Sequence, residues 1–288
     1  MLRKFVSLFV EEPIVPHQPQ LSFKTIKKNI GDLDLAKILT DYCVSQKGED
    51  FLVNLIFKNK KNGTFIDIGA HDGVRFSNSF AFSKLGWAGI CVEAHPDYYK
   101  ICCNNRENDS TKIYNVACAN VNSEDITFYS NYRGSLSTLN PNLNEYYKTA
   151  YKGYYVDNNH NEKVENFTNG KIQIKSLTMN TIIDTNYEFL NNGDIDLISI
   201  DVDGSEESVL GGFDILKYKP RVIIFEVSVV RSVVENYMKN KNYYKLYDNN
   251  LNAIYCRDNA DMNLFQTQFE KIKNNVIITY DTGHPLDD

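Results

Sequence analysis

The sequence has little of what defines several special classes of protein. Seven prolines and 15 glycines in 288 residues are too few for a collagen-like or low-complexity chain. The formal net charge of −6 lacks the basic excess that a general nucleic-acid binder needs. No apolar run approaches the ~20 residues of a membrane-spanning helix. Because 42% of the residues are hydrophobic, we expect an acidic globular protein with a sizeable core.

The cysteines form no C-x-x-C pair, so neither a zinc site nor a disulfide framework is expected. They are dispersed at Cys43, Cys91, Cys102, Cys103, Cys118 and Cys256. Unpaired cysteines favour a reducing compartment, and we predict a cytoplasmic protein. Residues 1–10 hold a short apolar run but no small-residue cleavage site, so a signal peptide is not expected.

Strand and helix patterns alternate from residue 64 onward. Short apolar runs predict strands at 64–68, 89–93, 113–117, 194–201 and 221–227, with two more within 243–258. Helical patterns lie over 32–59 with a polar break, over 76–85, from Pro96 onward and over 209–216. This alternation predicts an α/β fold, in which helices cover both faces of a mostly parallel sheet.

Residues 120–180 interrupt the alternation, because they are polar, rich in Asn and Tyr, and without strong periodicity. We interpret them as an inserted, partly irregular segment over the sheet. The predicted organisation is an N-terminal extension with helices over 1–60, a main domain over 61–258 that carries this insertion, and a C-terminal extension over 259–288.

The sharpest local signal is FIDIGAHDG at 65–73, where a hydrophobic strand ends in D-x-G-x-x-x-G. Glycines at such a turn let the backbone bend tightly and approach a ligand closely. The pattern lacks the three-glycine cradle that dinucleotide-binding loops use for pyrophosphate. Glu93 ends the next strand, where an acidic side chain can accept hydrogen bonds from ribose hydroxyls. We expect Gly69 and Glu93 to share one site; the alternative is an ordinary strand–turn–helix with a surface glutamate.

A second acidic group lies in DVDGSE at 201–206. Its carboxylates could contact a cationic ligand, act as a general base or bind a metal ion. Acidic residues also offset the dipole at a helix start, which explains Glu206 without any function. Asp201 ends a buried apolar strand, so we favour a functional role there. Both interpretations stay open for Asp203 and Glu206.

The order of these motifs resembles the FkbM-type methyltransferases, a family of class I enzymes that use S-adenosylmethionine. The matching segments are SQ at 45–46, ED at 49–50, FIDIGAHDG at 65–73, SN at 77–78, GWAG at 86–89, Glu93, Pro96, Arg106, ISIDVDGSE at 198–206, Val209, Leu210 and Gly212. The resemblance implies a Rossmann-like, seven-stranded, mostly parallel sheet. It also implies S-adenosylmethionine as cofactor and methyl transfer to oxygen, often on sugars or natural products.

The resemblance further implies roles for individual residues. The glycine loop would line the methionine part of the cofactor, Glu93 would bind the ribose, and residues 115–118 would approach the adenine. Asp201 would lie near the methionine amine or the reacting centre. The complete set of implied cofactor-binding residues is Gln46, Asp50, Asp67, Gly69, Ala70, Gly73, Glu93, Ala117 and Asp201.

Two positions depart from the family pattern, which commonly has Asn where His71 stands and Glu where Asp203 stands. The shorter side chain of Asp203 puts a direct contact by that carboxylate in doubt. His71 is either a new acid or base, or a loop residue without a chemical role.

Methyl transfer to an alcohol requires alignment of the acceptor oxygen with the methyl group and a base that takes the hydroxyl proton. The candidates for this base are His71, Asp203 and Glu226, each at or near the end of a predicted strand. No Ser–His–Asp or Cys–His spacing supports covalent catalysis. A divalent metal at Asp201, Asp203 and Glu206 is chemically reasonable but not favoured, because carboxylates at strand ends are common.

The chain has 19 tyrosines, and many of them fall in the predicted insertion. Tyrosine offers a flat apolar face and a polar tip, which suits a carbohydrate ring. We predict a glycan or small-molecule acceptor that contacts Tyr129, Tyr132, Tyr147 and Tyr151. The alternative is that these tyrosines only cover the sheet.

The leading hypothesis is therefore an O-methyltransferase that transfers a methyl group from S-adenosylmethionine to a sugar, glycan or similar hydroxylated acceptor. One alternative is a nicotinamide-dependent oxidoreductase that uses Glu93 on the ribose, which the missing third glycine disfavours. The other is a non-catalytic binding protein with the methyltransferase fold. The intact glycine loop and Glu93 disfavour it, since an abandoned cofactor site need not keep them.

Overall fold

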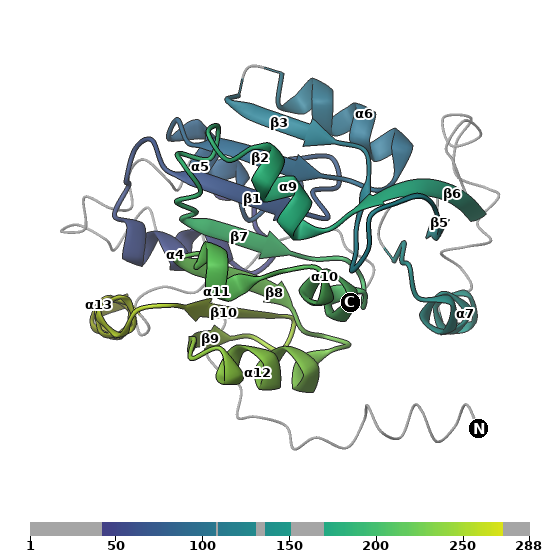
Figure 1. Ribbon diagram of the computed structural model, residues 1–288. Coiled ribbons are helices and arrows are strands. Elements are labelled where there is room, and N and C mark those ends of the chain that lie inside the picture. Colours follow the sequence, from purple (N-terminus) through teal and green to yellow (C-terminus); the bar gives the residue numbers. More distant parts are fainter. Residues whose placement is uncertain (1–41, 108, 131–135, 151–169, 273–288) are drawn as a thin grey trace.

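The computed structural model describes residues 42–107, 109–130, 136–150 and 170–272. Its main sheet contains β1 (Thr64–Ile68), β2 (Ala88–Val92), β3 (Thr111–Tyr114), β7 (Leu197–Ile200), β8 (Val222–Glu226), β9 (Tyr244–Asp248) and β10 (Asn252–Cys256). The seven strands lie in the order β3-β2-β1-β7-β8-β10-β9 (Figure 1). All neighbours are parallel except at β10, which runs antiparallel to β8 and β9. The predicted α/β fold with a mostly parallel sheet is confirmed.

Helices cover both faces of this sheet because successive strand side chains point to opposite sides. Phe65 belongs to one core cluster and its neighbour Ile66 to the other. The first cluster includes α4 (Glu49–Phe57), α5 (Phe80–Lys84), α6 (Pro96–Asn105) and α13 (Asn259–Ile272). The second includes α9 (Met179–Thr185), α10 (Glu206–Gly211), α11 (Ile215–Tyr218) and α12 (Arg231–Asn240).

Several predicted elements differ in extent from those in the structure. The helix expected over 76–85 is reduced to α5, because the Ser77 hydroxyl accepts the backbone N–H groups of Ser79 and Phe80 and holds a turn before it. The helix expected over 209–216 is divided into α10 and α11. Asp214 makes the division by accepting the Lys217 N–H at 3.1 Å as the cap of α11.

The strand expected over 113–117 is also divided, since β3 ends at Tyr114 and Ala117 begins β4 (Ala117–Cys118) in a second sheet. Of the helical pattern over 32–59, the structure describes the part from residue 42 onward, where α4 follows the polar break.

The interpretation of 120–180 as partly irregular is wrong for much of its described part. β5 (Ser123–Ser130) and β6 (Gly170–Leu177) pair antiparallel, and β4 adds to β6 to complete a three-stranded sheet. This small sheet and α7 (Pro141–Ala150) lie beyond the edge of the main sheet at which β3 ends (Figure 1). The domain boundaries stay a prediction. No helix in the described ranges is long and apolar enough to span a membrane.

Candidate functional site

A pocket lies at the carboxyl ends of the parallel strands, formed by the last residues of β1, β2, β7 and β8 and the turns that follow them. The predicted site residues that line it are Gln46, Asp67, Gly69, Ala70, His71, Glu93, Ala117, Asp201, Asp203 and Glu226. The other two predicted residues, Asp50 and Gly73, are outside this lining. Topology thus brings together segments that are far apart in the sequence.

Asp50 is fully buried beside the start of α4. Its carboxylate accepts hydrogen bonds from the Ser45 hydroxyl at 2.6 Å and from the Val44 backbone N–H at 2.9 Å. Burial raises the pKa of Asp50 to about 6. The side chain therefore fixes the turn that carries Gln46, and Gln46 in turn lines the pocket.

The turn after β1 requires glycine for steric reasons. Gly69 has φ +85°, and a Cβ added there would lie 1.7 Å from the carbonyl oxygen of Asp201. Gly73 has φ +80°, and its Cβ would lie 2.8 Å from the Cys102 sulfur. The first glycine lets β1 and β7 approach each other at the pocket, and the second lets the loop pack on α6.

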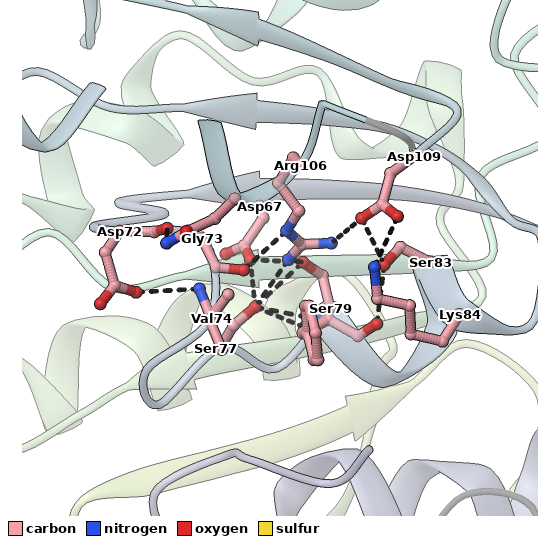
Figure 2. Close-up of polar contacts among 12 residues, drawn as sticks. Asp67, Asp72, Gly73, Val74, Ser77, Ser79, Ser83, Lys84, Arg106 and Asp109 are labelled. Carbon is pink, nitrogen blue, oxygen red and sulfur yellow. Dashed lines mark hydrogen bonds and ion pairs between the residues drawn. The ribbon is translucent and has the colours of Figure 1, made fainter. Parts of the chain in front are cut away.

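Arg106 lies beneath this loop and is 1% exposed. Its Nε donates to the carbonyl oxygen of Gly73 at 2.6 Å, and its Nη2 donates to the hydroxyls of Ser77 and Ser79 (Figure 2). Ser79 in turn donates to Asp67 Oδ2 at 2.6 Å. Burial raises the pKa of Asp67, although the serine hydrogen bonds and the charge of Arg106 oppose that effect. The network therefore ties the loop to the end of β1.

Glu93 connects the turns that follow β1 and β2. One carboxylate oxygen accepts the backbone N–H of His71 at 2.7 Å, and the other accepts that of His95 at 2.7 Å. The residue is 7% exposed, and burial raises the pKa of its carboxyl. Both oxygens are thus held in place by the backbone while the residue lines the pocket.

Four carboxyl groups gather at the ends of β7 and β8, from Asp201, Asp203, Glu206 and Glu226. Burial and the mutual repulsion of these groups raise the pKa values of Asp201 and Asp203 well above the usual range, and that of Glu206 to about 8. Burial also raises the pKa of Glu226, which shares a hydrogen bond with Asp201. The cluster therefore holds protons near neutral pH and favours a positively charged ligand.

Among the described residues, no group of three His, Cys, Asp or Glu side chains has an arrangement that could hold a metal ion. The lining is rich in acidic side chains and also carries the basic side chain of Arg75.

His71 occupies the left-handed region with φ 51°. Its ring stacks on Tyr98 with 3.8 Å between centroids, and its Nδ1 lies 3.9 Å from Asp72 Oδ1. The backbone N–H of His71 donates to Glu93, and the charge of the His71 ring opposes the rise in the pKa of that carboxyl.

The insertion contributes apolar residues to the pocket, namely Phe128, Leu136 and Leu139. The backbone N–H of Leu136 donates to Asp203 Oδ2 at 3.1 Å, which ties this segment to the acidic cluster. The predicted acceptor residues Tyr129 and Tyr147 are not part of the lining, and Tyr147 is 5% exposed. Tyr132 and Tyr151 lie outside the described residues.

Asn78 and Ser199 also line the pocket, although no role is predicted for them from the sequence. Both fall within the family motifs, in SN at 77–78 and ISIDVDGSE at 198–206, which is the signal that could have found them.

The fold and the site define a class I methyltransferase: a Rossmann-like sheet with one antiparallel strand, a glycine turn after β1 and an acidic residue after β2. The Methyltransferase FkbM domain matches residues 67–263, which is more than half of the chain. The chain therefore belongs to the FkbM methyltransferase family.

Several solved structures are similar to the chain. An FkbM methyltransferase from Methylobacillus flagellatus shares 14% identity at a TM-score of 0.43, with 82% of this chain and 58% of that chain covered. This chain thus spans less than two thirds of that protein. An O-methyltransferase from Bacillus cereus in complex with SAH shares 12% identity at a TM-score of 0.32, with 88% and 96% covered. A precorrin-6y C5,15-methyltransferase from Geobacter metallireducens shares 11% identity at 0.37, with 75% and 89% covered. No curated protein matches the chain.

Proposed function

We propose that the protein is an S-adenosylmethionine-dependent O-methyltransferase whose acceptor is a hydroxyl group of a sugar, glycan or similar small molecule. The observation that carries this proposal is the pocket itself, in which the glycine turn, Glu93 and the acidic cluster meet. When bound, S-adenosylmethionine supplies the methyl group and a sulfonium leaving group.

The cofactor end of the pocket is the part near β1 and β2. Glu93 accepts the ribose hydroxyls through the remaining lone pairs of its backbone-held carboxylate. Ala117 borders the adenine, while Gly69 and Ala70 allow the methionine part to pass close to the backbone. Asp67, Gln46 and Asp201 complete this end, and Asp50 and Gly73 act through the turns they stabilise.

The acidic cluster attracts the positive charges of the cofactor. In the ligand-free protein its carboxyls hold protons, because burial and mutual repulsion raise their pKa values. A cation in the pocket stabilises their ionised forms, so that binding releases protons.

Asp203 is the general base that we favour. One oxygen of its carboxylate is held by the Leu136 N–H, and burial raises the pKa of the carboxyl, so the form that is ionised when a cation binds is a stronger base than a solvent-exposed carboxylate. Glu226 is hydrogen-bonded to Asp201, and His71 is stacked on Tyr98, so both are less available for this role. They remain the second and third candidates.

The acceptor lies beside the insertion. Phe128, Leu136 and Leu139 offer apolar surface for the carbon face of a sugar ring. Tyr129, Tyr132, Tyr147 and Tyr151 stay part of the proposal as outer contacts. The free cysteines support a cytoplasmic location.

The test is methyl transfer from isotope-labelled S-adenosylmethionine to a panel of monosaccharides and oligosaccharides, with mass spectrometry to locate the label. We expect label on a hydroxyl oxygen, and a fall in rate of about 10²- to 10⁴-fold in Asp203→Asn. The variant should still bind S-adenosylhomocysteine, which shows that it is folded. Label on nitrogen or sulfur, or an undiminished rate in Asp203→Asn, would contradict the proposed acceptor or the proposed base, respectively.

A further inference from the structure

Asn78 lines the pocket and holds a buried hydrogen-bond acceptor that no described residue uses. Its side chain is 6% exposed, and its Nδ2 donates to the Ser199 hydroxyl at 3.0 Å. Its Oδ1 is buried and has no partner among the described residues. Because buried polar atoms are nearly always hydrogen-bonded, this oxygen points to a ligand that carries a donor.

The anchor on Ser199 fixes the direction of this oxygen. Ser199 in β7 is the register partner of Asp67 in β1, so Asn78 lies over the junction of these two strands. Asp67 Oδ2 accepts hydrogen bonds from Ser77 and Ser79. Asn78 Oδ1 is the buried side-chain oxygen at this junction that has no partner among the described residues.

The strand order places this junction relative to the ribose site. Glu93 follows β2, which lies on one side of β1, whereas β7 lies on the other. With the adenine beside Ala117, which follows β3, and the ribose at Glu93, the amino-acid part of the ligand extends toward β7. This step rests on the proposed function.

S-adenosylmethionine carries few hydrogen-bond donors that could pair with this oxygen. The ribose hydroxyls are at Glu93 and the adenine amine lies toward β3, which leaves the α-ammonium group as the donor at the β1–β7 junction. The nearby carboxylates of Asp67 and Asp201 favour a cation there over the cofactor's own carboxylate.

We propose that Asn78 Oδ1 accepts a hydrogen bond from the α-ammonium group of S-adenosylmethionine and selects for ligands that carry this group. Ser199 is the positioning residue that orients the Asn78 amide.

The test compares S-adenosylhomocysteine with its analogue that lacks the α-amino group, by calorimetry on the full chain. We expect the wild-type protein to bind S-adenosylhomocysteine about tenfold or more tightly than the analogue. Asn78→Leu should lose this preference, because the substitution weakens the binding of S-adenosylhomocysteine and leaves that of the analogue unchanged. Asn78→Asp keeps an acceptor of the same shape and should retain the preference.

Asn54→Leu is the matched control, because Asn54 is also a buried asparagine but lies in α4 outside the pocket lining. Its preference should equal that of the wild type. Equal affinity of the wild type for both ligands would overturn the inference, as would loss of S-adenosylhomocysteine binding in Asn78→Asp, which would indicate contact with the ligand carboxylate. Failure of the wild type to bind either ligand would overturn the proposed function as well.

Discussion

Arg106 shows how strongly one buried residue can determine the shape of the site. Its guanidinium group contacts the Gly73 carbonyl, two serine hydroxyls and Asp109 (Figure 2). Removing one partner of a buried ionic network leaves the others desolvated and uncompensated. The residue therefore supports both the stability of the fold and the position of the glycine loop.

We expect Arg106→Met to lower the free energy of unfolding by about 3–5 kcal/mol, since the buried Asp67 loses its cation and the Gly73 carbonyl loses its donor, while Asp109 keeps its ion pair with Lys84. Arg106→Lys should fall between this variant and the wild type, because it keeps the charge but not the fork of donors. Urea unfolding measures both values. Arg257→Met is the control: its ion pair with Asp258 is more exposed and should contribute at most about 1 kcal/mol. If Arg106→Met and Arg257→Met lowered the free energy of unfolding equally, this account would be contradicted.

Two glycines with positive φ allow a matched test of the turn after β1. Gly69→Ala should cost at least about 3 kcal/mol, because strained backbone and overpacking against Asp201 combine. Gly170→Ala, with nothing within 4 Å of the added Cβ, should cost only the strain of about 1–2 kcal/mol. Thermal unfolding of both variants gives the comparison, and a milder effect at Gly69 than at Gly170 would refute the close approach.

The limits of sequence reasoning are visible at this scale. Glu93 and Gly69 could be placed at one edge because each follows an apolar strand. The backbone contacts of Asp50 and the unused oxygen of Asn78 depend on the packing of segments distant in the chain. No local pattern encodes that packing.

At the scale of elements, the turn from β7 into α10 carries the strongest electrostatic signature. Four carboxyls face one another there, and the pKa of Glu206 is raised from 4.5 to about 8. A folded-state pKa above the unfolded one means that the folded protein binds more protons between the two values. The associated stability is present below about pH 4.5 and is lost as the pH rises through about 8.

We therefore expect the ligand-free protein to become less stable between about pH 5 and pH 8, by up to ~1.4 kcal/mol per pH unit for each extra proton held. Glu206→Gln should flatten this dependence. Urea midpoints measured across the range check both statements. Stability that rises with pH over this window would show that the cluster is ionised in the fold.

The predicted bounds of the elements were most accurate for apolar strands that are buried on both faces, as in β1 and β8. They were least accurate in the insertion. The alternation of Ile172 and Ile174 with polar neighbours in β6 was a readable strand signal, but the surrounding Asn- and Tyr-rich composition obscured it. The division of β3 from β4 follows from the second sheet, which no local signal announces.

At the scale of the whole molecule, one sheet separates two apolar cores and presents its carboxyl edge to a pocket. The alternation of strands and helices was sufficient to predict this architecture, because it reflects the physical requirement that both faces of a parallel sheet be covered. The place of Phe128, Leu136 and Leu139 in the pocket lining could not be predicted, since it depends on how residues 120–180 pack against that edge.

The central claim is that this edge binds S-adenosylmethionine and its product, and the most direct test is calorimetric titration of the full chain with S-adenosylhomocysteine. We expect one site per chain with a dissociation constant in the range of about 1 μM to 1 mM, weakened at least about tenfold in Glu93→Gln. No binding at about 1 mM, or tighter binding of NAD than of S-adenosylhomocysteine, would contradict the claim.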